Sequence, residues 1–135
     1  MALIEWSESL SVGITEFDDQ HKKLIELINQ LNDAMKAGKA KEILAKIFSD
    51  IVTYTATHFA AEEKLLGKHE YVHLFAHKTE HNKLVTKALE LNKDFQSGKM
   101  MISMAVMDFL KEWLQTHILG TDKKYGPFLN GKGVK

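Results

Sequence analysis

Cysteine is absent from this 135-residue chain, and proline occurs once, at Pro127. Without cysteine there can be no disulfide, zinc ribbon, thiolate-held iron–sulfur cluster or cysteine nucleophile. Because proline interrupts helices, a chain whose one proline lies near its end can form long, continuous helices.

An excess of charge of either sign is also missing, since 18 Lys and Arg residues balance 18 Asp and Glu residues. Nucleic-acid binding calls for a clustered basic excess, so we expect no nucleic-acid partner. No apolar run approaches the ~20 residues that span a bilayer, and the first residues lack the features of a secretion signal. We therefore expect a soluble, cytoplasmic protein without membrane insertion, folded as a single domain over residues 1–135.

Four segments have apolar residues at alternating steps of three and four, which is the period of a helix with one buried face. The predicted helices cover residues 18–37, 41–66, 71–96 and 103–119. A glycine lies at or just beyond the end of each, as helix ends often require. Four amphipathic helices with short connections predict an all-α fold, an antiparallel up-down four-helix bundle with an irregular N-terminal segment and a short C-terminal tail.

The seven histidines are the unusual feature of the composition. Five of them occupy the inward-facing stripes, where a core residue should be apolar, and two carboxylates accompany them. These seven polar residues are His21, His58, Glu62, His77, His81, His117 and Asp122. A single histidine in such a stripe is more often a hydrogen-bonded core residue than a ligand. Five on four helices would be strongly destabilising unless a metal held by facing helices satisfied them together.

The number and type of these side chains favour iron. Five imidazoles and two carboxylates exceed the four ligands of a closed zinc site, and calcium and magnesium prefer oxygen. Imidazole with carboxylate suits iron, and seven ligands suit two ions bridged by carboxylates. Ferritin-like di-iron bundles need two Glu-x-x-His motifs, whereas this chain has one, Glu70 to His73.

The spacing of these residues resembles the hemerythrin family. The matching strings are His21, His58-Phe59-Ala60-Ala61-Glu62, His77-Lys78-Thr79-Glu80-His81 and His117-Ile118-Leu119-Gly120-Thr121-Asp122. Trp6 and the string Asp18-Asp19-Gln20-His21 are similar to the bacterial branch of the family. The resemblance covers nearly the whole chain.

The resemblance implies a non-haem centre of two iron ions with an oxo or hydroxo bridge, which binds dioxygen reversibly. It implies that His77, His81 and His117 hold one iron and that His21 and His58 hold the other. Glu62 and Asp122 would then bridge the two ions. Four apolar residues, which ordinary core packing would also explain, match the oxygen pocket of the family: Phe59, Trp113, Leu114 and Ile118.

Two features depart from the family pattern. Val72 stands where a proline is common, and His69 and His73 are additional histidines that we expect at the surface or beside the ligands. The string from His69 to His73 also matches the His-Glu-x-x-His motif of zinc proteases. It follows Gly67 near a predicted helix start and has no third ligand of its own, so protease activity is a remote alternative.

The resemblance favours oxygen carriage, storage or delivery over enzymatic activity. The expected partners are dioxygen and an oxygen-consuming client protein, and we expect a monomer. The alternatives are a di-iron enzyme or detoxifying protein that acts on peroxide or nitric oxide, and an oxygen or redox sensor that works with a separate partner. A fixed set of seven ligands does not suit metal storage.

Overall fold

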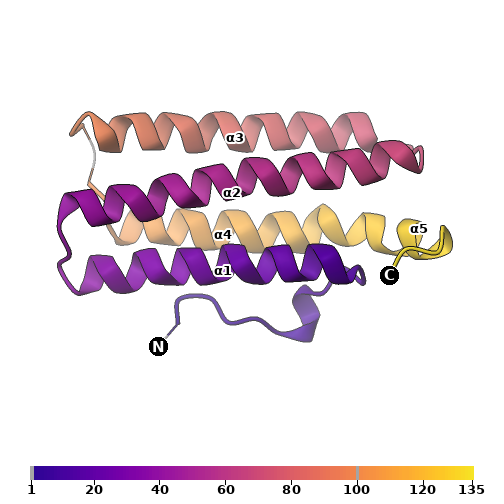
Figure 1. Ribbon diagram of the computed structural model, residues 1–135, viewed down its shortest axis with the longest axis horizontal. Helices are drawn as coiled ribbons and strands as arrows, with labels where there is room; N and C mark the ends of the chain where they lie inside the picture. Colours follow the sequence, from indigo (N-terminus) through magenta and orange to yellow (C-terminus); the bar gives the residue numbers. More distant parts are fainter. Residues whose placement is uncertain (1, 100) are drawn as a thin grey trace.

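The computed structural model describes residues 2–99 and 101–135 and places four long helices side by side (Figure 1). They are α1 (Thr15–Lys36), α2 (Lys41–Lys68), α3 (Leu74–Gln96) and α4 (Met104–Gly120). Successive helices join at alternating ends, and no strand occurs among the described residues. The prediction of an all-α, antiparallel four-helix bundle is confirmed.

The helices follow one another around the bundle, so that α1 packs against α2 and α4, and α2 packs against α3. Their inward faces bury the apolar residues that the helical period predicted, such as Leu24, Ile28, Phe48 and Leu110. No helix in the described part of the chain is long and apolar enough to cross a membrane.

The N-terminal segment lies along the outside of α1 (Figure 1) and contains one short 3₁₀ turn, η1 (Glu8–Leu10). The Asn29 side chain holds it through both backbone groups of Ile4, at 2.9 Å to the nitrogen and 2.8 Å to the oxygen. Helix α1 begins at Thr15 rather than at residue 18. The Asp18 carboxylate accepts hydrogen bonds from Ser11 Oγ and from the Val12 backbone nitrogen, which fixes the chain that enters the helix.

Helix α3 begins three residues after the approximate start at residue 71 that the sequence predicted. Residues 69–73 form a turn in which Glu70 has a φ of +56°, a left-handed conformation that ends α2 at Lys68 and delays α3 to Leu74. Tyr71 is buried beneath this turn and packs against Phe128, with ring centroids 5.0 Å apart.

The C-terminal tail, for which the sequence predicted no helix, forms the 3₁₀ turn η2 (Asp122–Lys124) and the short helix α5 (Tyr125–Gly131). Pro127 is tolerated in α5 because the first backbone nitrogens of a helix have no helical acceptor. The turn between α2 and α3 and the segment from η2 through α5 lie at the same end of the bundle (Figure 1). They cover the end at which the histidines gather.

Candidate metal centre

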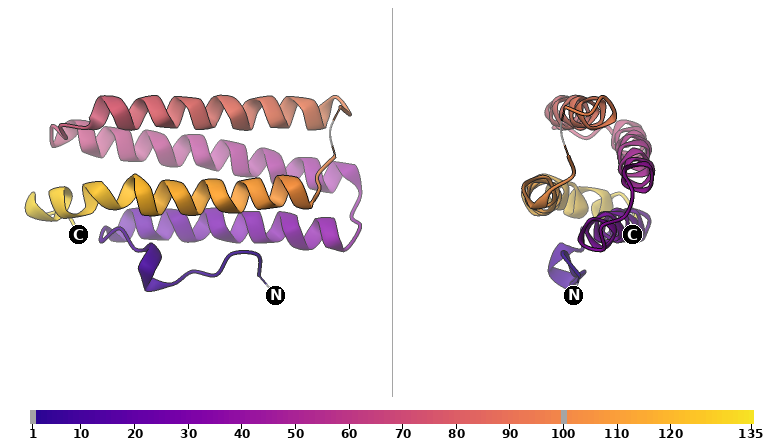
Figure 2. Two further views of the ribbon diagram at one scale, coloured as in Figure 1. Left: turned by 180° about the vertical axis from the view of Figure 1, so that it is seen from behind. Right: turned by 90° about the vertical axis from the view of Figure 1, so that its left-hand side faces the viewer.

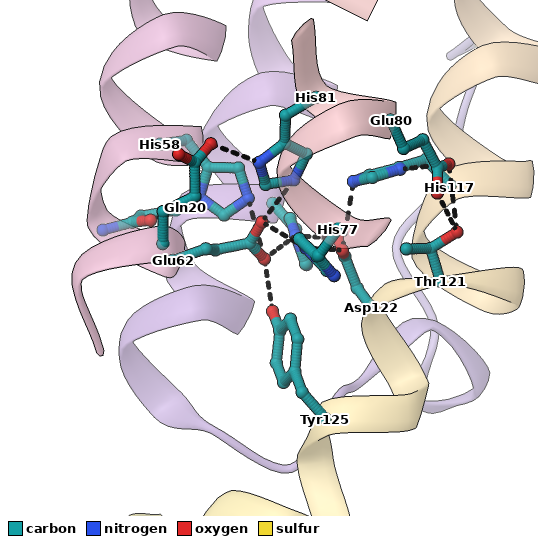
Figure 3. A network of polar contacts seen from close by, with 12 residues as sticks. Gln20, His58, Glu62, His77, Glu80, His81, His117, Thr121, Asp122 and Tyr125 are labelled. Atoms are coloured by element: carbon teal, nitrogen blue, oxygen red, sulfur yellow. Dashed lines mark hydrogen bonds and ion pairs between the residues drawn. The ribbon is translucent and has the colours of Figure 1, made fainter. Parts of the chain in front are cut away.

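The seven predicted ligand residues come together in the core near this end of the bundle (Figure 3). Helix α1 supplies one of them, α2 and α3 supply two each, and α4 and η2 supply one each. None is more than 3% exposed. The residues that offer donor atoms for a metal ion are His21, His58, Glu62, His77, His81, His117 and Asp122.

The Glu62 carboxylate faces two pairs of histidines with its two oxygens. Oε1 lies 3.6 Å from His77 Nε2 and 3.2 Å from His81 Nε2. Oε2 lies 3.7 Å from His21 Nε2 and 3.3 Å from His58 Nε2. Each oxygen therefore belongs to a different group of imidazoles.

The two carboxylate oxygens of Asp122 also face different histidines. Its Oδ1 lies 3.4 Å from His77 Nε2 and 3.0 Å from His117 Nε2, whereas its Oδ2 lies 3.1 Å from His21 Nε2. The donors form one group of His77, His81 and His117 and a second group of His21 and His58, and both groups include Glu62 and Asp122. In each group all donor atoms lie within 4.8 Å of one another.

These donor atoms fit metal ions better than they fit one another. The Nε2 atoms of all five histidines, Oε1 of Glu62 and both Asp122 oxygens are buried without a hydrogen-bond partner, although they lie close together. Adjacent ligands of a six-coordinate ion with bonds of about 2.1 Å stand about 3.0 Å apart. The shortest separations in the cluster match that spacing, and buried donors without partners would be costly unless a cation satisfied them.

The charges of the cluster also call for a cation. Burial lowers the pKa of His21 and of His77, but the close Asp122 and Glu62 carboxylates outweigh it and raise each to about 9. Burial also lowers the pKa of His117, but its hydrogen bonds to Asp122 and Glu80 outweigh burial and raise it to about 10. Burial raises the pKa of Glu62, yet the neighbouring His58 and His21 bring it well below its ordinary value. Two ionised carboxylates in a core thus demand positive charge, which either protons or metal ions can supply.

Three of the five imidazoles are oriented from behind by a side chain that accepts a hydrogen bond from Nδ1. His58 donates to Gln20 of α1, and His117 donates to Glu80 of α3 at 2.9 Å (Figure 3). His81 donates to Glu63 of α2 at 2.9 Å. In each pair the acceptor comes from a neighbouring helix. Such hydrogen bonds fix the ring orientation and the tautomer that leaves Nε2 free to bind a metal.

Tyr125, the first residue of α5, donates a hydrogen bond to Oε2 of Glu62 (Figure 3). Its ring is fully buried and packs edge-on against Phe17, with centroids 5.5 Å apart. Burial, with the nearby Glu62 charge, raises the pKa of Tyr125 well above its ordinary value, so the hydroxyl remains a donor. The C-terminal helix is in this way tied directly to the cluster.

The four residues expected to form an oxygen pocket are all on inward-facing sides of α2 and α4. Phe59 stacks flat on the His81 ring, with centroids 3.7 Å apart and planes 2° apart. Leu114 and Ile118 are buried, and Trp113 is half-buried with its ring 6.5 Å from that of Phe59. Of these four residues, Phe59 therefore gives the cluster an apolar cover on this side.

The two additional histidines lie outside the cluster. His69 follows the last residue of α2 and is half-buried, whereas His73 precedes α3 and is exposed. A turn separates them, so they do not share a helix face as the zinc-protease motif requires, and neither belongs to a group of metal donors among the described residues.

Sequence reasoning missed the hydrogen-bond partners of the ligands. Gln20, Glu63 and Glu80 each directly precede or follow a ligand in the chain, which places them off the inward-facing stripe. Their position next to a residue of the cluster was the one feature of the sequence that could have indicated this role. The helical period itself gives no indication that a side chain reaches across to the next helix.

Comparison with known proteins identifies the family. The family model described as "Hemerythrin HHE cation binding domain" matches residues 12–129. The chain belongs to the hemerythrin family. A similar curated protein is a bacteriohemerythrin of Methylococcus capsulatus, which is 35% identical over 96% of this chain and 99% of that protein. Another is a hemerythrin-like protein of Naegleria gruberi, which is 36% identical over 89% of this chain and 88% of that protein. A crystal structure of a wild-type hemerythrin is 33% identical, covers 93% of this chain and 97% of its own, and superposes with a TM-score of 0.89.

As a hemerythrin, the chain has a cation-binding domain, and its cluster of buried histidines and carboxylates is compatible with metal binding. A single-residue variant of a hemerythrin superposes equally closely, with a TM-score of 0.90. The four-helix architecture is therefore that of the family.

Proposed function

We propose that this hemerythrin binds dioxygen reversibly at a centre of two non-haem iron ions, in the service of oxygen carriage, storage or delivery. The observation that supports it best is that Glu62 and Asp122 each divide their two oxygens between two groups of imidazoles. A carboxylate placed in this way suits a bridge between two ions. The name bacteriohemerythrin among its relatives points in the same direction.

In this proposal His77, His81 and His117 hold one ion, His21 and His58 hold the other, and Glu62 and Asp122 bridge them. A ferrous pair held by these residues, with a bridge derived from solvent, would supply the two electrons that reversible dioxygen binding requires. The group with two imidazoles offers fewer protein donors than the group with three. The group of His21 and His58 would therefore leave more room for a small ligand beside an ion held there.

The surrounding side chains exclude water from one side of the centre. Phe59, Leu114 and Ile118 are each at most 3% exposed, and the flat stack of Phe59 on His81 leaves no space for water between the two rings. A dry apolar wall gives a bound molecule no proton donor, which favours release over reduction. This is the physical reason for preferring a carrier to an enzyme.

The test is metal analysis combined with ultraviolet–visible spectroscopy of the reduced protein. We expect two irons per chain, a charge-transfer band that appears on exposure to oxygen, and loss of that band when oxygen is removed. A protein that takes up iron but oxidises irreversibly on first exposure would rule out carriage.

The bridging residues have their own test. Glu62→Ala should lose both irons and lower stability, because the same carboxylate contributes to both groups of donors. The matched control is Glu26→Ala, which removes an exposed carboxylate of α1 and should keep both irons. Full iron content in Glu62→Ala would refute the bridging assignment.

A second candidate is a di-iron enzyme that acts on peroxide or nitric oxide. The observation in its favour is a cleft of about 190 Å³ that reaches His77 and is lined by polar groups of His73, Glu80, Thr121 and Lys124. Such a cleft offers a path for protons toward the centre. Steady turnover of peroxide or nitric oxide that is lost in His58→Ala would favour this candidate.

A further inference from the structure

The edge between α3 and α4 is the loosest of the bundle. Helix α3 approaches α4 less closely than it approaches α2, and the end-on view shows α3 and α4 well separated (Figure 2). Each of the other neighbouring pairs of helices is in closer contact. The edge between α3 and α4 nevertheless passes directly over the cluster, because α3 carries His77 and His81 and α4 carries His117.

Glu80 of α3 bridges this edge. One carboxylate oxygen, Oε1, accepts hydrogen bonds from His117 Nδ1 at 2.9 Å and from Thr121 Oγ1 at 3.0 Å. The other oxygen, Oε2, accepts from the same hydroxyl at 2.8 Å. Thr121 directly follows α4 and directly precedes Asp122, so one side chain ties α3 to the segment that bears two of the metal donors.

Clefts lie on both sides of this bridge. One, of about 190 Å³, has Tyr71, His77, Thr121 and Lys124 among its lining residues. The other, of about 280 Å³, has Leu84, Phe109, Trp113 and His117 among its lining residues. Glu80 lines both, so its contacts with α4 separate two openings that each reach a histidine of the cluster.

Few other contacts hold α3 against α4 at this end. Its buried residues are His77, His81 and, toward the far end, Phe95, whereas Leu74 and Leu84 are only half-buried. The fully buried residues of α3 near the cluster are therefore His77 and His81 themselves. An edge held mainly by one carboxylate opens more easily than one held by an apolar core.

We propose that the α3–α4 edge is the route by which metal ions enter and leave the cluster. The hydrogen bonds of Glu80 to His117 and Thr121, called the latch below, hold this edge closed. This inference rests on the metal site of the proposed function, because it concerns the passage of ions to those donors. Glu80 is a positioning residue, since it acts through His117 and Thr121.

The experiment compares four variants of the iron-loaded full-length chain with the native protein. Glu80→Ala removes the latch, and Glu80→Gln keeps an acceptor oxygen in its place. Thr121→Val removes one hydroxyl from the latch but leaves the hydrogen bond between His117 and Glu80. The matched control is Glu63→Ala, because Glu63 also accepts from a ligand Nδ1, that of His81 at 2.9 Å, but across the closely packed α2–α3 pair.

Two rates are measured: iron release to a ferrous chelator, and uptake of ferrous iron by the stripped protein under anaerobic conditions. We expect Glu80→Ala to release iron roughly 10- to 100-fold faster, as the loss of a group that supports a ligand commonly weakens a site. It should also take up iron faster, because the closed edge is the barrier in both directions. Thr121→Val should accelerate both rates by about fivefold, the equivalent of one hydrogen bond, and Glu80→Gln should remain near the native rates.

The control separates a latch from a residue that only orients a ring. Glu63→Ala should speed release but leave uptake unchanged. Native-like uptake in both Glu80→Ala and Thr121→Val would overturn the latch, and Thr121→Val decides the question if Glu80→Ala fails to fold. A native chain that binds no iron would instead refute the proposed function, so the two failures are distinguishable.

Discussion

At the scale of single residues, the hydroxyl of Tyr125 donates a hydrogen bond to Oε2 of Glu62. Tyr125→Phe keeps the ring but leaves a buried carboxylate oxygen without its donor. We expect the free energy of unfolding to fall by about 1–3 kcal/mol, with both irons retained. The measurement is denaturant unfolding of the iron-loaded protein alongside metal analysis.

The control for this change is Tyr54→Phe, which removes a hydroxyl from a half-buried position on α2. Its effect should stay within about 0.5 kcal/mol, as is usual for surface changes. Equal stability of the two variants would show that the hydrogen bond to Glu62 contributes nothing measurable.

The sequence predicted which residues gather in the cluster, because ligands on helices must follow the helical period. His58 and Glu62, like His77 and His81, are four residues apart and lie on one helix face. The side chains that orient the imidazoles could not be predicted in the same way. Glu80 reaches across an edge whose width depends on how whole helices pack, which no local pattern records.

At the scale of elements, Gly126 permits the close approach of α5 to the N-terminal segment. A Cβ at this position would lie 2.2 Å from the backbone oxygen of Val12. The Asp18 carboxylate holds the Val12 nitrogen at 2.8 Å, so the segment cannot move away freely. We expect Gly126→Ala to lower the free energy of unfolding by about 1–3 kcal/mol, the usual cost of overpacking, as measured by denaturant unfolding.

Gly131, the last residue of α5, provides the matched control. A Cβ there would have no atom within 4 Å, and its φ is not positive. Gly131→Ala should therefore leave stability unchanged or raise it by about 0.4–1 kcal/mol, through the reduced entropy of the unfolded chain. Destabilisation of similar size in both variants would contradict the steric explanation.

The helical period predicts the long helices of the bundle but neither their exact ends nor a very short helix. The period located all four long helices, but it extended the third into the turn around Glu70, whose positive φ is unusual for a residue other than glycine. The same method missed α5, because a helix of 7 residues is too short to display a period. Its stability comes from the burial of Tyr125 and Leu129 against the rest of the molecule.

At the scale of the whole molecule, charged and polar groups are buried together at the end of the bundle that holds the cluster, beside the apolar core of the four helices. Glu62 and Asp122 are fully buried, and the five surrounding histidines come from all four long helices. Metal ions that bind these donors only in the folded state stabilise every helix at once. Stability and metal content should consequently rise and fall together across the ligand variants.

Removal of the metal gives the last prediction, in which stability depends on pH. Without metal ions, protonated histidines must balance the two carboxylates, and the pKa of His21 and of His77 is accordingly raised to about 9, and that of His117 to about 10. A group whose pKa is raised by folding stabilises the protein fully below its unfolded pKa, near 6.5, and loses that contribution as the pH rises through the folded value. The free energy of unfolding of chelator-stripped protein, measured in urea, should thus fall between about pH 6.5 and about pH 10. That of the iron-loaded protein should not fall, because its ions supply the positive charge at every pH in that range. Parallel curves for the two forms would mean that protons on these histidines do not replace the metal.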